Sequence, residues 1–392
     1  MFFENRNFKQ SGIMEKINVG VVGVGFIGVA HIEALRRLNN VEVTAIMDQD
    51  DDIEKKAGQL GVDKWFSDYG KLLQDSDIDC VHICTPNYLH YEMTKEALLA
   101  GKHVVCEKPL TTNVSESEEL VELAEKKGVI NAVNFNIRFY PLMHELNAAI
   151  QKGEMGEIYS VHGSYLQDWL FHATDYNWRL EKVLSGDSRA VADIGSHWMD
   201  LTEFVTGLQI TEVFADFATF HQIRKKPLKP VETYAGKLLK PEDYKDIPID
   251  TEDFASILFR FENGARGSLT VSQVFAGRKN RITLEVAGSK KSAAWNSESP
   301  NEIWFGNRDT SNESLLRDPS IMHSESRDIV SFPGGHNEGF PDTMKQHFSK
   351  IYARIGDRNL PENYPTFKAG LREIILCDKI IESQKQEKWI KI

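Results

Sequence analysis

The feature that most constrains the fold is a glycine-rich hexapeptide, "GVGFIG", which follows an apolar strand pattern and runs directly into a helical one. Its three glycines, Gly23, Gly25 and Gly28, permit a tight turn, a close backbone approach to a phosphate and close packing of a helix on a strand. The N–H groups at the start of the helix would face that phosphate. The residues between the last two glycines, which are expected at the same site, are Phe26 and Ile27. This context predicts the first unit of a dinucleotide-binding α/β domain.

An aspartate follows the glycine loop at the distance expected of a ribose ligand. Asp48 ends the second strand pattern, "VTAIMD". A carboxylate there would accept hydrogen bonds from the adenosine ribose hydroxyls and would repel a 2′-phosphate. The sequence therefore predicts NAD, with NADP disfavoured. The alternative is that Asp48 merely begins the acidic turn "DQDDD".

The rest of the chain divides by its strand rhythm. Up to about residue 136, short strand patterns alternate with helical ones, which is typical of a parallel sheet built from βαβ units. Longer β-rich segments follow, and "FENGARG" carries the Asn-Gly turn of an antiparallel hairpin. We expect an α/β protein: a loose extension at residues 1–14, a Rossmann doubly wound parallel sheet at 15–136, and an α+β domain with a large, mostly antiparallel open sheet at 137–392. The last would bind substrate and form oligomers.

Charge and cysteine content exclude several classes of partner. The formal net charge of −12 over 392 residues would repel nucleic acid and anionic lipid. The one basic run, "IRKKPLKP" at residues 223–230, contains prolines and indicates an exposed excursion. No apolar run approaches the ~20 residues of a membrane helix, and the first residues do not resemble a secretory signal. The four cysteines stand singly, without the spacing of a zinc site, and indicate reduced thiols in a cytoplasmic protein.

Polar residues end two of the expected parallel strands. The stretch "GKHVVCEKPL" ends in Glu107 and Lys108. Ligands of such sheets bind beyond the carboxyl ends of the strands, so these residues are expected to face the nicotinamide end of the dinucleotide. The alternative is a strand that runs out into a solvated turn. The cofactor-binding residues expected from the neighbouring stretch, "CTPNYLH", are Thr85, Pro86, Asn87 and His90.

The stretch "AVADIGSHWMDLTEFVTG" predicts a helix that carries an acid and a histidine. Asp193 and His197 are four residues apart and so share a helix face. A third ligand with a recognisable spacing is missing, so we expect no metal. Two structural alternatives remain open: Asp193 could cap the helix, and His197, beside Trp198, could be a core histidine.

Five stretches together resemble one large family. They are "GVGFIG", "CTPNYLH", "ALLAGKHVVCEKPL", "DIGSHWMDL" and "EDFASILFRFENGARGS". The chain resembles, from about Lys16 to its final helix, the glucose-fructose oxidoreductase and inositol dehydrogenase family of NAD(P)-dependent sugar oxidoreductases. Within it, "SQVFAGRKNR" and "GGHNEGF" are most similar to levoglucosan and glucoside 3-dehydrogenases. Upstream of Asp193, "SGDSRAVA" departs from the glycine-rich run of many relatives.

The resemblance implies roles for individual side chains. Lys108 matches the family's catalytic lysine, next to a Lys-Pro bond that is usually cis in relatives. Asp193 and His197 match the pair that faces the substrate. We expect His197 to act as general base, Lys108 to stabilise charge on the reacting oxygen, and Asp193 to orient the histidine or the substrate. Trp178 and Arg179 are expected near the cofactor and the substrate pocket.

A carbohydrate site is indicated by an alternation of polar and aromatic residues. Polar groups would bind sugar hydroxyls, and rings would pack on the C–H faces. An exposed strand would show the same alternation. The expected substrate-binding residues are Tyr165, Gln167, Asp168 and Trp169, together with His336 of "PGGHNEGFPD", which resembles a pocket loop in anhydrosugar and glucoside dehydrogenases.

These features predict an NAD-dependent oxidoreductase that interconverts a secondary hydroxyl and a ketone on a sugar, anhydrosugar, glycoside or polyol. A homodimer or homotetramer is expected because one face of an open sheet would remain uncovered. Two alternatives exist on the same fold. One is an NAD-dependent glycosidase that first oxidises a ring carbon, and the other is a nucleotide-sensing regulatory protein without turnover. The presence of Lys108, Asp193 and His197 argues against the regulatory protein.

Overall fold

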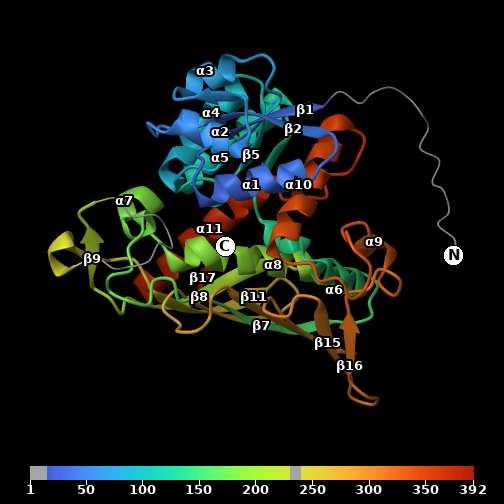
Figure 1. The fold of residues 1–392 in the computed structure, drawn as a ribbon. Coiled ribbons are helices and arrows are strands. Elements are labelled where there is room, and N and C mark those ends of the chain that lie inside the picture. Colours follow the sequence, from blue (N-terminus) through green and yellow to red (C-terminus); the bar gives the residue numbers. More distant parts are fainter. Residues whose placement is uncertain (1–15, 230–239) are drawn as a thin grey trace, which may run out of the picture.

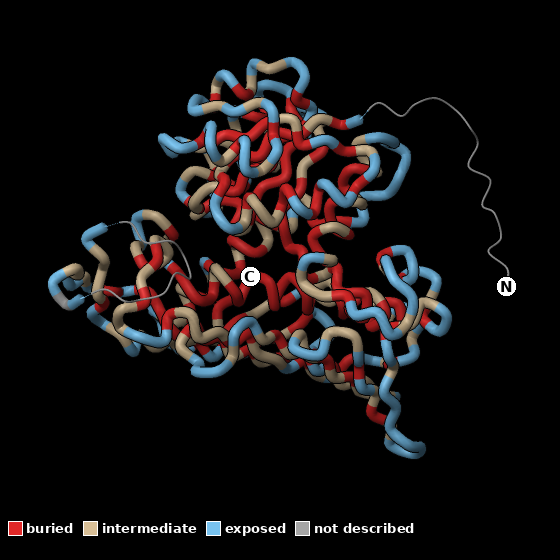
Figure 2. Tube along the Cα trace, viewed as in Figure 1, coloured by how far each residue is buried: buried red, intermediate tan, exposed pale blue. Residues whose placement is uncertain are grey.

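The computed structural model describes residues 16–229 and 240–392, so the expected extension at residues 1–14 lies outside the described residues. Two bodies are visible in Figure 1, the blue N-terminal one above and the green-to-orange one below. Buried chain runs through the middle of both bodies and through the region where they meet (Figure 2). No helix within the described ranges is long and apolar enough to cross a bilayer.

The upper body is the predicted Rossmann fold. Its parallel sheet has the strand order β3-β2-β1-β4-β5-β6. The strands are β1 (Ile17–Val22), β2 (Val41–Met47), β3 (Lys64–Phe66), β4 (Cys80–Ile83), β5 (His103–Cys106) and β6 (Asn131–Val133). The helices are α1 (Phe26–Arg36), α2 (Ile53–Leu60), α3 (Tyr69–Gln74), α4 (His90–Leu99) and α5 (Val114–Lys127). The strand order reverses between β1 and β4, and the crevice at such a switch point is where α/β sheets bind ligands.

The strands of this sheet are buried, as expected of a central parallel sheet. Val19, Val21, Val81 and Ile83 are fully buried, as expected of strands that are covered by helices on both faces. The three-residue strand β3 was not predicted, because it is short and only partly buried.

The lower body contains the predicted open sheet, with nine strands in the order β16-β15-β14-β13-β7-β12-β11-β8-β17. All neighbours are antiparallel except β7 and β12. The predicted hairpin is β11–β12, and Gly264 in its turn has a φ of +89°. The strands are β7 (Ile158–Leu166), β8 (Ile210–Ala218), β11 (Phe254–Phe261), β12 (Arg266–Ser272), β13 (Arg281–Gly288), β14 (Ser292–Asn296), β15 (Glu302–Gly306), β16 (Glu313–Leu316) and β17 (Ile390–Lys391).

Alternation along these strands gives the sheet one apolar face. Val161, Ile257 and Leu284 point into a core shared with helices, whereas His162 and Leu258 are exposed on the other face. The helices of this body are α6 (Pro141–Gln151), α7 (Lys182–Ser185), α8 (Ser196–Thr206) and α9 (Ser324–Arg327).

Two C-terminal helices link the bodies. α10 (Phe340–Gly356) lies beside α1 (Figure 1), and its residues Phe348 and Ile351 share a core with β1 of the upper body. α11 (Phe367–Gln386) places Phe367 in the core of the upper body and Leu376 in that of the lower body. The boundary at residue 136 stays a prediction, but α10, grouped by sequence with residues 137–392, packs on the dinucleotide sheet.

The basic run forms part of a two-stranded sheet, β9 (Ile223–Pro227) with β10 (Tyr244–Pro248). Three of its four basic residues have acidic partners: buried Arg224 bonds Asp253, Lys225 pairs with Asp246, and Lys226 pairs with Glu181. Most of the positive charge of the run is therefore locally neutralised. Residues 230–239 of the excursion lie outside the described residues.

Candidate active site

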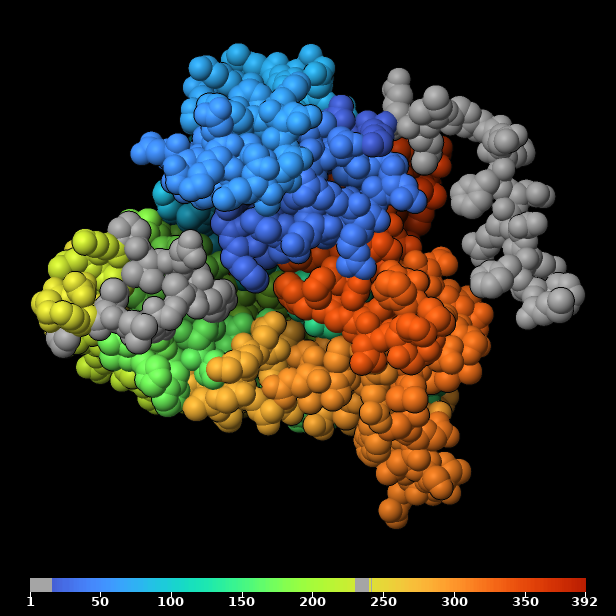
Figure 3. Space-filling view, in the orientation of Figure 1, coloured from blue at the N-terminus to red at the C-terminus, as the bar shows by residue number. Residues whose placement is uncertain are grey.

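A cavity of about 770 Å³ lies between the carboxyl edge of the parallel sheet and the lower body. The residues that line it come from both sides of the junction where the blue residues meet the green and orange ones in the space-filling view (Figure 3). Most of the residues singled out from the sequence line it. They are Gly23, Gly25, Phe26, Ile27, Asp48, Thr85, Pro86, Asn87, Glu107, Lys108, Tyr165, Gln167, Trp169, Trp178, Arg179, Asp193 and His197.

The glycine loop has the shape of a phosphate cradle. Gly23 has a φ of +86°, and a Cβ there would lie 2.8 Å from the carbonyl group of Cys84. A Cβ on Gly25 would meet nothing within 4 Å, so backbone faces open space. Gly28 does not line the cavity; a Cβ there would lie 2.0 Å from the Gly23 carbonyl oxygen, so it is required for packing.

Two polar groups in the cavity also fit a dinucleotide. One oxygen of Asp48, Oδ2, accepts a hydrogen bond from Val24 N at 2.8 Å, which fixes the carboxylate beside the loop. The buried hydroxyl of Thr85 has no hydrogen-bond partner among the described residues, so it is available to a ligand. Together with the glycine cradle, these groups would hold the ribose and phosphates.

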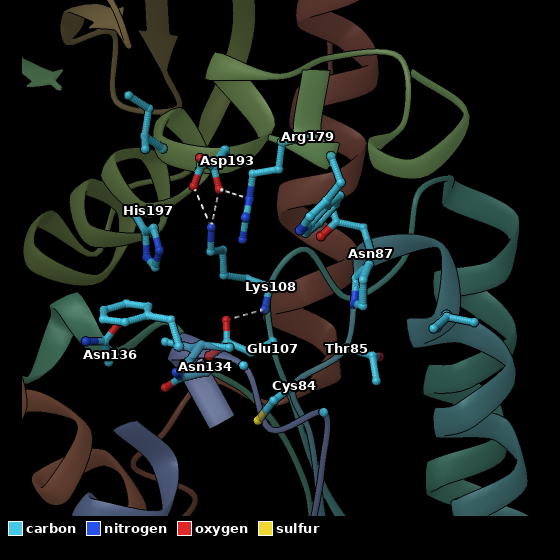
Figure 4. A pocket seen from close by; sticks show the side chains of 18 of the residues that line it. Cys84, Thr85, Asn87, Glu107, Lys108, Asn134, Asn136, Arg179, Asp193 and His197 are labelled. Atoms are coloured by element: carbon cyan, nitrogen blue, oxygen red, sulfur yellow. Dashed lines mark hydrogen bonds and ion pairs between the residues drawn. The ribbon is translucent and has the colours of Figure 1, made fainter. Parts of the chain in front are cut away.

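Lys108 and Asp193 are joined at the other end of the cavity (Figure 4). Lys108 Nζ donates to Asp193 Oδ1 at 2.7 Å and to the Asp193 carbonyl oxygen at 2.8 Å. Gln273 Nε2 donates to the other carboxylate oxygen at 2.8 Å, and Arg179 Nε lies 3.3 Å from Oδ1. Burial opposes ionisation, but Lys108 and Arg179 hold the pKa of Asp193 well below its usual range. Asp193 is therefore an anion that orients the lysine.

This geometry bears on two interpretations of Asp193. The predicted helix begins as a π-helical turn, η4 (Val191–Gly195), and the donors to the Asp193 carboxylate in the described residues are side chains rather than backbone N–H groups. Such turns occur often at functional sites. Its carboxylate bonds Lys108 and Gln273, whereas no hydrogen bond joins it to His197 in the described part of the chain. The Lys108–Pro109 bond is cis, as the resemblance implies.

His197 lines the cavity as a neutral ring. It is 7% exposed and packs edge-on against Phe135, with ring centroids 5.6 Å apart. Burial and then the charge of Lys108 lower its pKa to about 3. Its buried Nδ1 has no partner among the described residues. A satisfied core histidine would have its buried nitrogens paired, so the arrangement favours a ligand-facing ring.

The predicted sugar residues are linked through a residue that the sequence analysis did not select. Asn280 Oδ1 accepts from Tyr165 Oη at 2.7 Å and from Gln167 Nε2 at 2.8 Å. Trp169 Nε1 donates to Gln167 Oε1 at 2.7 Å. These side chains form a hydrogen-bonded wall of the cavity.

Besides Gly28, three of the selected residues lie outside this cavity. His90 is fully buried behind its wall, and its ring nitrogens lie 2.7 Å from the Pro109 oxygen and 2.9 Å from the Thr85 oxygen. It braces the two strand ends, which corrects its assignment as a cofactor ligand. Asp168 instead accepts from Lys279 Nζ at 2.7 Å.

His336 is the third correction. Its side chain is exposed, and its Nδ1 lies 3.3 Å from the Gly334 oxygen. The buried Arg317 side chain holds this loop through carbonyl oxygens, including that of His336. The residues that this region contributes to the cavity are Phe340 and Met344 of α10.

Comparisons with known proteins agree with this arrangement. A model described as an oxidoreductase family with an NAD-binding Rossmann fold matches residues 17–135, and the GFO/IDH/MocA C-terminal domain matches residues 143–294. The levoglucosan dehydrogenase of Pseudarthrobacter phenanthrenivorans is 29% identical over 97% of this chain and 99% of its own length. The myo-inositol 2-dehydrogenase of Thermotoga maritima is 30% identical over 70% of this chain and 73% of its own.

Solved structures extend the similarity to the whole fold. Levoglucosan dehydrogenase in complex with NADH and L-sorbose matches with a TM-score of 0.86 at 28% identity, over 97% of this chain and 99% of that one. The resemblance, the fold class and the use of NAD predicted from the sequence are thereby confirmed. This chain belongs to the GFO/IDH/MocA family of NAD-dependent oxidoreductases that act on the CH–OH groups of sugars and polyols.

Proposed function

We propose that this protein oxidises a secondary hydroxyl of a sugar to the ketone, and reduces the ketone in the reverse direction. Levoglucosan and related anhydrosugars are the first candidates. The observation that carries the proposal is the cluster of Lys108, Asp193 and neutral His197 at one end of a cavity with a phosphate cradle at the other. The near-complete coverage of a curated levoglucosan dehydrogenase supports the choice of substrate class.

The chain's own residues would place the substrate and move its proton. The nicotinamide cofactor, when bound, would supply the hydride chemistry, with NAD⁺ as the acceptor in oxidation and NADH as the donor in reduction. Lys108, held by the Asp193 carboxylate, would stabilise negative charge on the substrate oxygen. His197 is neutral and so has a lone pair to take the hydroxyl proton. In reduction the protonated ring would return that proton.

A substrate screen tests this proposal. Purified protein with NAD would be supplied with anhydrosugars, glycosides and inositols, and NADH formation would be followed by absorbance. We expect net NADH with at least one of them and a ketone product. A released leaving-group alcohol without net NADH would instead identify the NAD-dependent glycosidase. Tight NADH binding with no turnover of any of these sugars would favour the regulatory protein.

Cofactor choice is expected to depend on Asp48. Replacing Asp48 with serine removes the carboxylate that would face a 2′-phosphate, so the preference for NAD over NADP should fall by about tenfold or more in kcat/KM. Steady-state kinetics with both cofactors measures this. Asp51→Ser is the matched control, because Asp51 is exposed in the same acidic turn but does not line the cavity. An equal effect of the two variants would mean that Asp48 only begins the turn.

We also propose a cytoplasmic homodimer or homotetramer. All four cysteines are buried and unpaired, which suits a reducing compartment. The open face of the nine-stranded sheet exposes Leu258 and Tyr159, which suits a contact between copies. Light scattering of the purified protein would give the number of subunits.

A further inference from the structure

Glu107 is a buried carboxylate whose role the proposed function leaves open. It follows β5, is 6% exposed, and lines the cavity next to Lys108. A buried charge is costly unless hydrogen bonds satisfy it. In the described residues, the hydrogen-bond partners of Glu107 are donors other than the side chains of lysine and arginine.

Three donors surround the carboxylate. Glu107 Oε1 lies 2.9 Å from His31 Nε2 and accepts from Asn134 Nδ2 at 2.5 Å. Glu107 Oε2 accepts from the backbone N–H of Lys108 at 3.2 Å. The Nζ of Lys108 is committed to Asp193, which leaves Glu107 without a salt bridge to lysine or arginine in the described residues.

A chain of buried groups fixes these donors. His31 Nδ1 lies 2.8 Å from His82 Nδ1, and His82 Nε2 lies 2.8 Å from Tyr352 Oη. The phenol can donate to His82, His82 to His31, and His31 to Glu107. On the other side, His347 Nδ1 donates to Asn134 Oδ1 at 3.0 Å, which turns the amide nitrogen of Asn134 toward Glu107.

Titratable groups lie around Glu107 on several elements. α1 brings His31, β4 brings His82, and Cys84 follows β4. His90 comes from α4, His197 from α8 and His347 from α10. Burial raises the pKa of Glu107, but the hydrogen bond and charge interaction with His31, followed by the charge of Lys108, outweigh burial and lower the pKa to about 2. The carboxylate therefore stays ionised at neutral pH, whereas burial keeps His82, His197 and His347 neutral.

The position of Glu107 in the cavity brings its charge toward the nicotinamide end of the cofactor site. The glycine cradle and Asp48 define the phosphate and adenosine end of the cavity, so the nicotinamide end lies toward Lys108 and Glu107. The nicotinamide ring carries a positive charge in NAD⁺ and loses it when it accepts a hydride. A fixed anion at that end interacts with the oxidised ring and much less with the reduced one.

We propose that Glu107, held in place by His31 and Asn134, is a counter-charge that makes the protein bind NAD⁺ more tightly, relative to NADH, than it otherwise would. The proposal rests on the NAD site but not on any sugar. Because the anion acts on the oxidised ring, its removal should weaken the binding of NAD⁺ and change the binding of NADH much less.

Binding measurements without substrate test the proposal. Dissociation constants for NAD⁺ and NADH would be measured by calorimetry for the wild type and for Glu107→Gln, which keeps the side chain's shape. We expect the ratio Kd(NAD⁺)/Kd(NADH) to rise by about tenfold, the scale of one unit charge acting across several ångströms of protein. The control is Glu119→Gln, which removes a negative charge from the surface of α5 and should leave the ratio unchanged. An unchanged ratio in Glu107→Gln, or equal weakening of both ligands, would overturn the proposal.

A second variant keeps the test decisive if Glu107→Gln does not fold. His31→Phe preserves the ring packing against Phe348 but removes the donor to Glu107. The carboxyl should then take up a proton more readily, so the ratio should rise as the pH is lowered from 8 toward 5. The wild-type ratio should stay constant over that range. A constant ratio in His31→Phe would contradict the counter-charge. Because no sugar is present, failure of the sugar assignment would not affect either result.

Discussion

Replacing Lys108 with methionine should lower the rate of sugar oxidation by roughly 10²-fold or more while NADH binding stays nearly intact. Methionine keeps an apolar stem of similar length but carries no ammonium group. The charge on the substrate oxygen would then develop without its nearest cation. Initial rates and fluorescence titration with NADH would be measured on the same sample.

The surroundings of Asp193 make this variant interpretable. After the substitution Asp193 keeps Gln273 and Arg179 as partners, so the buried carboxylate is not left without donors. Lys152→Ala is the matched control, because it breaks a lysine–carboxylate pair with Glu325 on the surface. Near-normal rates in a folded Lys108→Met protein would mean that the strand end is only a solvated turn, and His197 alone would remain as the candidate proton-transfer group.

The second large effect should appear in stability at acidic pH. His82, His197 and His347 are buried, and burial holds the pKa of each well below its usual range, to about 3 for the last two. In the unfolded chain each would titrate near 6.5. Unfolding below that pH therefore takes up a proton at each site, so stability is full above pH 6.5 and is lost as the pH falls. At pH 5 the cost is about 2 kcal/mol for each histidine and about 6 kcal/mol for three.

Three carboxyls oppose this trend. Burial and the neighbouring carboxylates Asp200 and Glu203 raise the pKa of Glu373 well above its usual range, and burial also raises the pKa values of Asp200 and Glu338, so their contribution to stability is lost as the pH rises. Burial lowers the pKa values of His90, His103 and His144 as well, so the histidines with lowered pKa values outnumber these carboxyls. Since a domain's total stability is about 5–15 kcal/mol, the melting temperature should fall steeply between pH 7 and pH 5.

A histidine substitution separates this mechanism from general acid damage. His347→Gln retains an amide that can donate to Asn134 but does not titrate. The slope of unfolding free energy against pH should decrease by about one proton. His172→Gln, at an exposed histidine, should leave the slope unchanged. Equal slopes in His347→Gln and the wild type would show that the buried rings do not control acid stability.

The fold was predictable wherever local pattern and burial coincide. The parallel strands are continuous apolar runs because both of their faces are covered, and the β11–β12 hairpin carries its Asn-Gly turn. The packing of α10 was not predictable, because its apolar face suits either core and only tertiary structure selects the Rossmann sheet. The successful predictions, those of the parallel strands and of the hairpin, needed only residues that are neighbours in sequence.

The residues of the site divide in the same way, into those that the strand pattern predicts and those that only the tertiary fold brings together. Lys108 and Thr85 were found because they follow strands whose carboxyl ends meet at one edge. Asn134 follows β6 at the same edge, so that rule could also have selected it. Gln273 follows β12 of the other body, and nothing in the sequence brings it to Asp193. Likewise, no spacing indicates that Asp193 would hold Lys108 rather than His197.

The helix α11 also limits how the cavity can open. One end of it is packed into the core of the dinucleotide-binding sheet and the other into the core of the open sheet, and Phe340 of α10 also packs against both bodies. A hinge rotation that widened the cavity would have to pull an apolar helix out of one of these cores, at a cost of several kcal/mol. We therefore expect the two bodies to move together as one rigid unit. NAD and sugar would then enter and leave by rearrangement of side chains and loops at the mouth of the cavity, without separation of the domains.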